Sequence, residues 1–216
     1  MRSLLILSGI IGCQAVFKPA DHAALKSAVD SCLIEDTGYR GQGSGSCPTF
    51  TASNDVTGYP YGAMGDWDVS QVQSLATMFD SAQGFNHDLS NWDVSQVTSL
   101  RNTFLSAVVF NSDISGWDVS KVTSLEKTFQ NAIAFNQDLS NWDVSQVTSL
   151  YMTFFLVGAD LNIGSWNTSK VTTMRNTFYG NTAFNTDISS WDVSQVTTFW
   201  TMFHNNKIFN RDLSKW

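Results

Sequence analysis

Charged residues are scarce in this sequence, and cysteine, proline and histidine are scarcer still. Only 14% of the 216 residues are charged, and there are three prolines, three cysteines and three histidines. The net charge of −7 leaves no basic surface to replace the counterions of a nucleic acid or to attach to anionic lipid. No apolar run approaches the roughly 18 residues of a transmembrane helix. The composition therefore excludes nucleic-acid binding and a membrane span.

The sequence contains no arrangement typical of a catalytic site. His22, His87 and His204 lie in different sequence contexts, and none is accompanied by a cysteine or serine in a nucleophile motif. We interpret all three as polar surface residues. We expect no enzymatic activity, no cofactor and no metal.

The first 15 residues, MRSLLILSGIIGCQA, combine one basic residue, an apolar run and small residues at the end. This pattern is typical of a secretory signal peptide, and cleavage after Ala15 leaves Cys32 and Cys47 as the only cysteines. Two cysteines in an exported chain predict a disulfide. The alternative is a lipoprotein signal, since residues 10–13 resemble a lipobox in which Cys13 carries the lipid. Both interpretations predict an extracellular or cell-surface location.

We predict that residues 16–65 form an N-terminal cap. Within this cap, the pattern of residues 21–34 predicts a helix with Asp21 as its N-cap. Its apolar side consists of Leu25, Ala28, Val29, Cys32 and Leu33. Residues 38–61 are rich in Gly, Ser and Thr, and we interpret them as a loop.

A repeat of about 25 residues fills residues 66–216. Its consensus is W-D-V-S-[QK]-V-T-S-L-x-x-T-F-x-x-A-x-x-F-N-x-D-L-S-N, and successive tryptophans are 25, 25, 25, 24, 25 and 25 residues apart. These tryptophans are Trp67, Trp92, Trp117, Trp142, Trp166, Trp191 and Trp216. A single unit of this length cannot bury its own apolar face, so the repeats are expected to stack.

Within one repeat the periodicity changes. Val97, Leu100 and Phe104 recur at helical spacing, and Ser95 is placed to cap that helix. Residues 113–119 predict a short strand that pairs with its copies in the neighbouring repeats. We therefore predict an α/β solenoid of six repeats, each with one helix and one short strand, behind the N-terminal helical cap.

Stacking would align equivalent residues of successive repeats in columns. Phenylalanines and tryptophans are expected to form apolar columns inside the stack. Asparagine and aspartate columns are expected to bond to loop backbone. The alternative for the aspartates is a Ca²⁺ site, because a row of carboxylates about 5 Å apart offers several oxygen ligands. The aspartate column contains Asp88, Asp113, Asp138, Asp187 and Asp212.

The repeat between Trp142 and Trp166 is one residue short, and residues 158–163 depart from the consensus. We expect a local kink there, with a binding notch as the alternative. Residues 167–169 form the only N-glycosylation sequon, which makes Asn167 a glycosylation site if the chain is made in a eukaryote.

The repeat consensus over residues 66–216 resembles that of the BspA-like, DUF285 family of surface proteins, found in bacteria, mycoplasmas and many algae. The segment between Phe17 and Pro48 also resembles the lead-in of algal members. The resemblance implies an extracellular, leucine-rich-repeat-like solenoid used in adhesion or surface structure, without enzymatic activity.

Two functions remain open. We expect Phe203, Phe209, Leu213 and Trp216 to lie uncovered at the end of the stack. They would pack near Trp67 of another copy and give a head-to-tail filament or surface layer, provided that the N-terminal segment lies to one side. The alternative is a monomeric adhesin that presents one face of the stack to a glycan or a protein.

Overall fold

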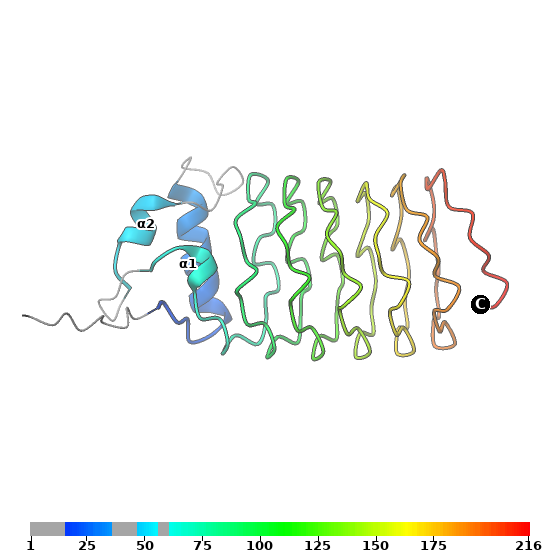
Figure 1. Cartoon of the computed structure of the whole chain (residues 1–216), viewed down its shortest axis with the longest axis horizontal. Helices are drawn as coiled ribbons and strands as arrows, with labels where there is room; N and C mark the ends of the chain where they lie inside the picture. Colours follow the sequence, from blue (N-terminus) through cyan, green and yellow to red (C-terminus); the bar gives the residue numbers. More distant parts are fainter. Residues whose placement is uncertain (1–15, 36–46, 56–60) are drawn as a thin grey trace, which may run out of the picture.

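The computed structural model describes residues 16–35, 47–55 and 61–216 (Figure 1). The repeats are wound as coils that stack along the long axis of the molecule, and each coil, or rung, runs from one conserved tryptophan to the next. Three helical elements precede the first rung: α1 (His22–Glu35), α2 (Pro48–Ala52) and the 3-10 helix η1 (Met64–Asp66). The first rung begins at Trp67, and the last rung comprises residues 191–216. The predicted signal peptide, with Cys13, lies outside the described residues.

The prediction of six helix-plus-strand repeats is wrong. In the described residues both α-helices precede the first rung, and the rungs contain neither a helix nor a strand. Successive rungs are joined instead by isolated parallel β-bridges at one repeat position. The bridged residues are Ser74, Ser99, Ser124, Ser149, Thr173 and Thr198.

The segment predicted to be a helix is a series of tight turns. The N–H of Thr103 bonds to the carbonyl of Leu100 at 3.1 Å, three residues back, where an α-helix would reach four residues back. Asn102 and Ser106 have φ angles of 58° and 55°, which no right-handed helix contains. Ser95 therefore caps no helix.

The apolar spacing that suggested a helix has another cause. Consecutive turns return the chain to the inside of the coil every three or four residues, as a helix would. Val97, Leu100, Phe104 and Ala107 are consequently all buried. The pattern identified the core residues correctly and their secondary structure incorrectly.

The predicted strand at residues 113–119 is also made of turns. Asp113 accepts a hydrogen bond from the backbone N–H of Ser115 at 2.9 Å, and Asp118 accepts one from that of Ser120 at 3.0 Å. In such turns the carboxylate of an aspartate accepts the backbone N–H of the residue two positions further on. This bond bends the chain away from the extended conformation.

Backbone hydrogen bonds join each rung to the next through alternate residues. At the first interface the donors are the N–H groups of Leu75, Thr77, Phe79 and Ser81, and the acceptors are the carbonyls of Ser99, Arg101, Thr103 and Leu105, at 2.7–3.0 Å. The same four bonds recur at each of the later interfaces. In this segment these N–H groups point toward the C-terminal end of the stack and the carbonyls toward its N-terminal end.

Aromatic columns fill the interior of the rungs. Phe104 stacks on Phe110 of its own rung at 3.8 Å and on Phe129 of the next rung at 5.7 Å between ring centroids. The indole N–H of Trp117 donates to the carbonyl of Leu89 in an earlier rung at 3.1 Å. Equivalent bonds are made by Trp92, Trp142, Trp166, Trp191 and Trp216. The tryptophans thus link rungs by packing and by a satisfied N–H group.

The helix α1 begins where the sequence indicates. The side chain of Asp21 accepts the N–H of Ala24 at 2.9 Å, as an N-cap does. The helix buries the five apolar residues of the expected side. Within residues 38–61, predicted as a loop, the structure describes residues 47–55 and 61, and α2 is found there. Pro48 at its first turn and the carboxylate of Glu35, which accepts the N–H of Thr49, favour this short helix.

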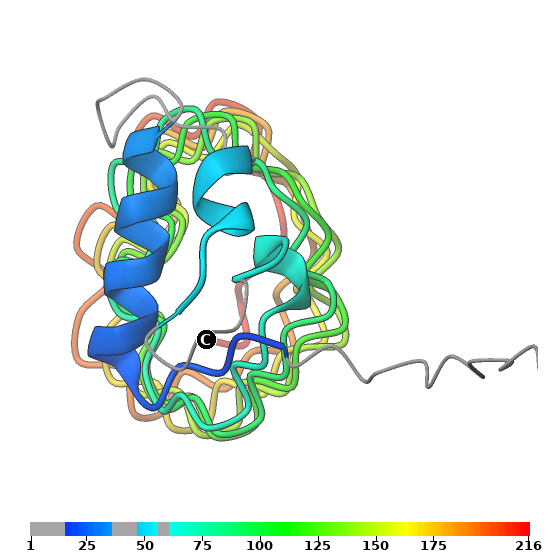
Figure 2. The ribbon, with the colours of Figure 1, turned by 90° about the vertical axis from the view of Figure 1, so that its left-hand side faces the viewer.

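The helices α1 and α2 lie across the N-terminal end of the stack (Figure 2). The imidazole of His22 donates through Nδ1 to the carbonyl of Ser74 in the first rung at 2.9 Å. Lys18 pairs with Asp68 at 2.7 Å. The ring of Phe17 lies 5.0 Å from that of Trp67, which is buried. The N-terminal segment therefore covers the apolar cross-section of the first rung.

Replacing Phe129 by alanine in a central rung should lower the free energy of unfolding by about 3–5 kcal/mol, because it leaves a cavity between stacked rings. Glu126→Ala, at an outward position of the same rung, is the control and should change it by less than about 1 kcal/mol. Denaturant unfolding measures both. Equal losses would contradict the assignment of Phe129 to the packed interior.

Candidate functional site

The structure places the two cysteines together in the cap. Cys32 of α1 and Cys47, which precedes α2, form a disulfide with their Cα atoms 5.0 Å apart. Both residues are buried, so this bond ties the two helices together beneath the surface.

Asn167 of the sequon is exposed, and its side chain accepts the N–H of Ser169 at 3.2 Å.

The aspartate columns serve the turns of their own rungs. The hydroxyl and the backbone N–H of Ser115 hold the pKa of Asp113 below its usual range. The serine two residues further on has the same effect on the pKa of Asp88, Asp138, Asp187 and Asp212. Among the described residues, no three His, Cys, Asp or Glu side chains gather as a metal site would require.

The three histidines lie apart. His22 bonds to the first rung, His87 is half-buried in the same rung, and His204 lies outside the last rung, stacked at 4.9 Å on Tyr179. The described residues bring none of them together with another histidine or with a cysteine.

The rung that departs from the consensus continues the stack. Leu150 and Met152 donate to the next rung at 3.1 Å, as their counterparts do elsewhere. Ala159 takes the place of the column phenylalanine, and Asp160 takes the place of the asparagine by accepting the N–H of Asn185 at 2.8 Å. The substitution therefore preserves the hydrogen bond of that column.

The last rung exposes side chains that every inner rung buries. Trp191 is 3% exposed and Phe178, Phe184 and Ile188 are 0% exposed. Their counterparts one repeat later are only partly buried: Phe203, Phe209, Leu213 and Trp216. The four residues expected to be uncovered thus lie together at this end of the stack. Trp67, their expected neighbour in another copy, lies beneath the cap.

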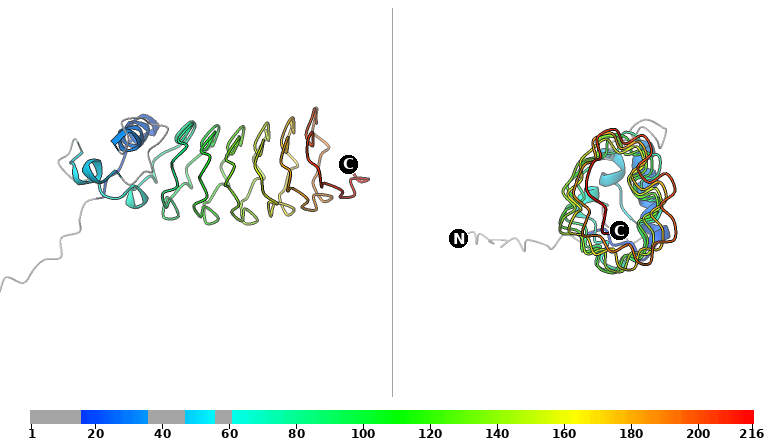
Figure 3. Two further views of the ribbon diagram at one scale, coloured as in Figure 1. Left: turned by 90° about the horizontal axis from the view of Figure 1, so that it is seen from above. Right: turned by 90° about the vertical axis from the view of Figure 1, so that its right-hand side faces the viewer.

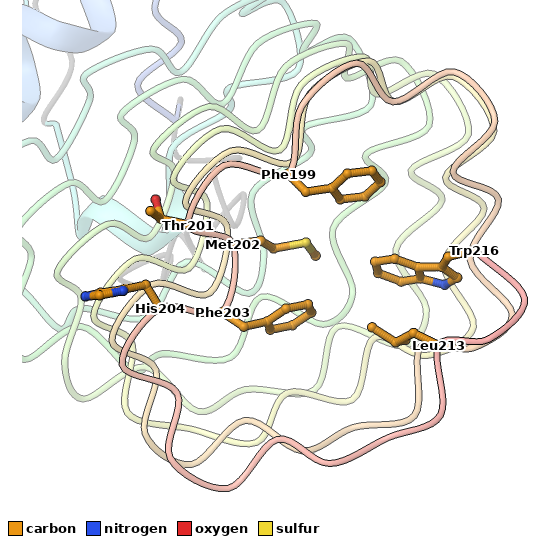
Figure 4. Close-up of a pocket in the computed structure, with 7 residues that line it drawn as sticks. All are labelled: Phe199, Thr201, Met202, Phe203, His204, Leu213 and Trp216. Atoms are coloured by element: carbon orange, nitrogen blue, oxygen red, sulfur yellow. The ribbon is translucent and has the colours of Figure 1, made fainter.

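These side chains surround a hollow of about 470 Å³ on the outer side of the last rung. Phe199, Met202 and Phe203 point into it from one wall, and Leu213 and Trp216 point into it from the other, while His204 points away (Figure 4). We define the C-terminal face by these five apolar residues. It forms the end of the stack opposite the cap (Figure 3).

A row of backbone donors borders the C-terminal face. At each inner interface the four N–H groups of this segment bond to the next rung. In the last rung the corresponding groups belong to Phe199, Thr201, Phe203 and Asn205, and they have no acceptor within the described residues. We refer to these four N–H groups as the donor row.

Phe199 and Met202 were not anticipated as part of this face. The available signal was the departure of the last repeat from its own consensus. Phe199 replaces a leucine or methionine, and Met202 stands where four inner rungs carry threonine. Those buried threonines donate to carbonyls of the preceding rung, as Thr177 does to Leu150 at 3.0 Å.

A second group of side chains, exposed at Arg175 and Trp200 and half-buried at Tyr151, Phe155 and Tyr179, lies along the outside of the last three rungs. The guanidinium of Arg175 lies 5.7 Å from the ring of Tyr151 and 4.3 Å from that of Trp200. Beside it, Phe155 stacks on Tyr179 at 4.6 Å. Trp200 is 59% exposed. We refer to this group as the lateral aromatic strip.

Acid should destabilise the protein through its aspartate turns. A carboxyl group whose pKa is lowered by folding stabilises the native state above its unfolded pKa of about 3.9, and this contribution is lost as the pH falls through the folded pKa. The double substitution Asp88→Asn, Asp113→Asn keeps the turn acceptors but removes two such carboxylates. Its free energy of unfolding should fall less steeply below about pH 4 than that of the wild type.

The matched control is Asp88→Ala, Asp113→Ala, which loses the turn acceptors as well. It should be less stable by roughly 1 kcal/mol even at neutral pH. Urea unfolding at a series of pH values measures these effects. Identical behaviour of the asparagine and alanine variants would show that the turns do not depend on these acceptors.

Comparison with family models identifies a match to the family described as "Mycoplasma protein of unknown function, DUF285", over residues 50–159 and 152–216. Comparison with curated proteins and with solved structures finds no match. In the described residues no helix is long and apolar enough to cross a membrane. Because the family model covers most of the chain, including all the rungs, the chain belongs to the DUF285 family.

Proposed function

We propose that this protein is an extracellular structural protein, without enzymatic activity, that assembles head to tail through its C-terminal face. The observation that carries the proposal is the difference between the two ends of the stack. The cap buries Trp67 at one end, whereas Phe203, Leu213 and Trp216 are partly exposed at the other. Exposed apolar surface of this kind, edged by polar groups, marks interaction sites.

Two features support an extracellular location. The Cys32–Cys47 disulfide is of a kind that persists in oxidising compartments. The charged content of 14% is low for a cytosolic protein.

The position of the cap changes the expected junction. Phe17 and α1 lie on the first rung, so a neighbouring copy meets the outer surface of the cap and does not continue the rungs directly. Because the two contact surfaces differ, such a contact propagates as a line and does not close into a dimer.

The charges of the two ends favour this orientation. Residues 191–216, the last rung, carry Lys207, Arg211 and Lys215 against Asp192 and Asp212, a net charge of +1. The described cap residues carry Asp21, Asp30, Glu35, Asp55 and Asp66 against Lys18 and Lys26, a net charge of −3. Contacts between opposite ends are attractive, and contacts between like ends are repulsive.

The substitution Leu213→Lys should weaken association of the protein at least about tenfold, because it places an ammonium group in an apolar contact. Ile208→Lys is the matched control, since Ile208 is 49% exposed and lies outside the C-terminal face. Sedimentation velocity and electron microscopy of the wild type and both variants measure the effect. A wild type that remains monomeric at high micromolar concentration and forms no filaments would contradict self-assembly.

The lateral aromatic strip favours a second function, that of a monomeric module binding a glycan or a protein. Its exposed Trp200 offers one ring face to a ligand, because Arg175 covers the other. Glycan-array binding that is lost in Trp200→Ala and retained in Leu213→Lys would favour this function. Binding that is unaffected by Trp200→Ala would exclude the strip as the site.

A further inference from the structure

One outer wall of the stack carries cations and aromatic rings in alternation. The ammonium group of Lys127 lies 5.5 Å, and the guanidinium of Arg175 5.7 Å, from the ring centroid of Tyr151. Lys127 belongs to the rung before Tyr151, and Arg175 belongs to the rung after it. One rung further on, the ring of Trp200 lies 4.3 Å from the guanidinium. We refer to these four residues as the cation ladder; each of its two cations has a rung on either side.

The guanidinium of Arg175 is held in place with its hydrogen-bond donors unused. Packing between Tyr151 and Trp200 covers its faces, whereas its N–H groups lie in its plane. Arg175 is exposed, and within the described residues its guanidinium makes neither a hydrogen bond nor an ion pair. A planar cation of this kind binds a carboxylate through two parallel N–H bonds. The rings fix the side chain beforehand, which lowers the entropic cost of binding.

The arginine at the same repeat position of an earlier rung differs in having a partner. Arg101 lies 3.6 Å from the carboxylate of Glu126. In the described part of the chain neither Lys127 nor Arg175 pairs with a carboxylate. The wall therefore holds two cations without counter-ions in a chain whose net charge is −7. Two cations are too few for a nucleic acid, but they can pair with single carboxylates.

The backbone of this wall is already paired and cannot recognise a peptide. The N–H of Lys127 bonds to the carbonyl of Tyr151 at 2.9 Å, and that of Met152 bonds to the carbonyl of Arg175 at 3.1 Å. The N–H of Tyr151 lies 3.3 Å from the hydroxyl of Ser149. An extended peptide binds to the edge of a sheet through such backbone groups, so the wall is left with side chains alone for recognition.

The charge of the chain also favours a thin ligand over a bulky one. A folded acidic protein would meet the field of the whole chain, whose net charge is −7. A linear polymer would contact only the wall, and charges further away than about 8 Å are largely screened at physiological salt. Lys127 and Arg175 come from rungs of one straight stack, so they follow its long axis (Figure 1).

We infer that the cation ladder binds a linear polysaccharide that carries carboxylate groups, such as a polymer of uronic acids. One carboxylate pairs with the donors of Arg175, and another carboxylate of the same polymer pairs with Lys127 on the other side of Tyr151. The inference rests on the second function proposed above, binding of a glycan by the lateral aromatic strip, and names the class of glycan.

The test measures binding of the full chain to sodium polygalacturonate by calorimetry at low ionic strength. Arg175→Gln should weaken binding at least about tenfold, because it removes the charge and the paired donors. Arg175→Lys keeps the charge without the planar fork, and it should weaken binding about threefold. Lys121→Gln is the matched control for charge, since Lys121 is exposed and lies outside the cation ladder. It should change the affinity less than about twofold.

Two further polymers identify what is recognised. Methyl-esterified polygalacturonate has the same sugar backbone without the negative charge, and it should not bind. Poly-L-glutamate carries carboxylates on a peptide backbone, and it should bind at least about tenfold more weakly than polygalacturonate. Equal binding of poly-L-glutamate, or an equal loss of affinity in Lys121→Gln and Arg175→Gln, would overturn the inference.

The inference and the function on which it rests fail separately. Binding of the methyl-esterified polymer that is lost in Trp200→Ala and unaffected by Arg175→Gln would overturn the inference and leave glycan binding by the strip intact. Absence of binding by every glycan would contradict both. Repeating the titrations with Leu213→Lys keeps self-association from raising the apparent affinity. Binding of polygalacturonate that is lost in this variant would also overturn the inference.

Discussion

The four backbone hydrogen bonds that the bridged segment makes at each interface run in one direction, and the stacking of the rungs depends on them. Each rung donates N–H groups toward the C-terminal end and accepts on its carbonyls from the N-terminal side. No rung can satisfy these groups by itself, so each is stable only beside another. The bonds also sustain left-handed backbone at ordinary residues, such as Lys127 at φ 56° and Met152 at φ 54°, which costs on the order of 1 kcal/mol each.

Side chains of the consensus reinforce this arrangement from within. The hydroxyl of Thr103, fully buried, lies 3.0 Å from the carbonyl of Leu75 in the preceding rung and 2.7 Å from that of Leu100 in its own. The indoles make equivalent bonds on the opposite wall, as Trp117 does to Leu89. A buried polar group without a partner would be strongly destabilising, so threonine and tryptophan recur in the repeat for hydrogen bonding as well as for packing.

The period, the core columns, the disulfide and the helix α1 could be predicted from the sequence, because each depends on apolar spacing or on residue type. The conformation within a rung could not. Successive turns bury residues at intervals of three and four, as a helix does. Asparagine, which favours left-handed backbone, stands at only some of the left-handed positions, and others carry residues such as Thr77 and Lys127 that give no turn signal. At the candidate site the four expected apolar residues do lie together. The donor row was beyond prediction, since it follows from backbone direction alone.

The two ends of the stack differ because the bridged segment presents carbonyls at the N-terminal end, which need donors, and N–H groups at the C-terminal end, which need acceptors. At the carbonyl end the chain itself supplies a donor, the imidazole of His22, together with apolar residues of α1. At the other end the donor row has no acceptor in the described residues, and water can reach it only while the C-terminal face stays exposed. An apolar partner that buried the row without accepting its hydrogen bonds would lose about 1–3 kcal/mol for each orphaned group. A partner that accepts these hydrogen bonds and also fills the hollow would therefore bind better than one that only fills the hollow.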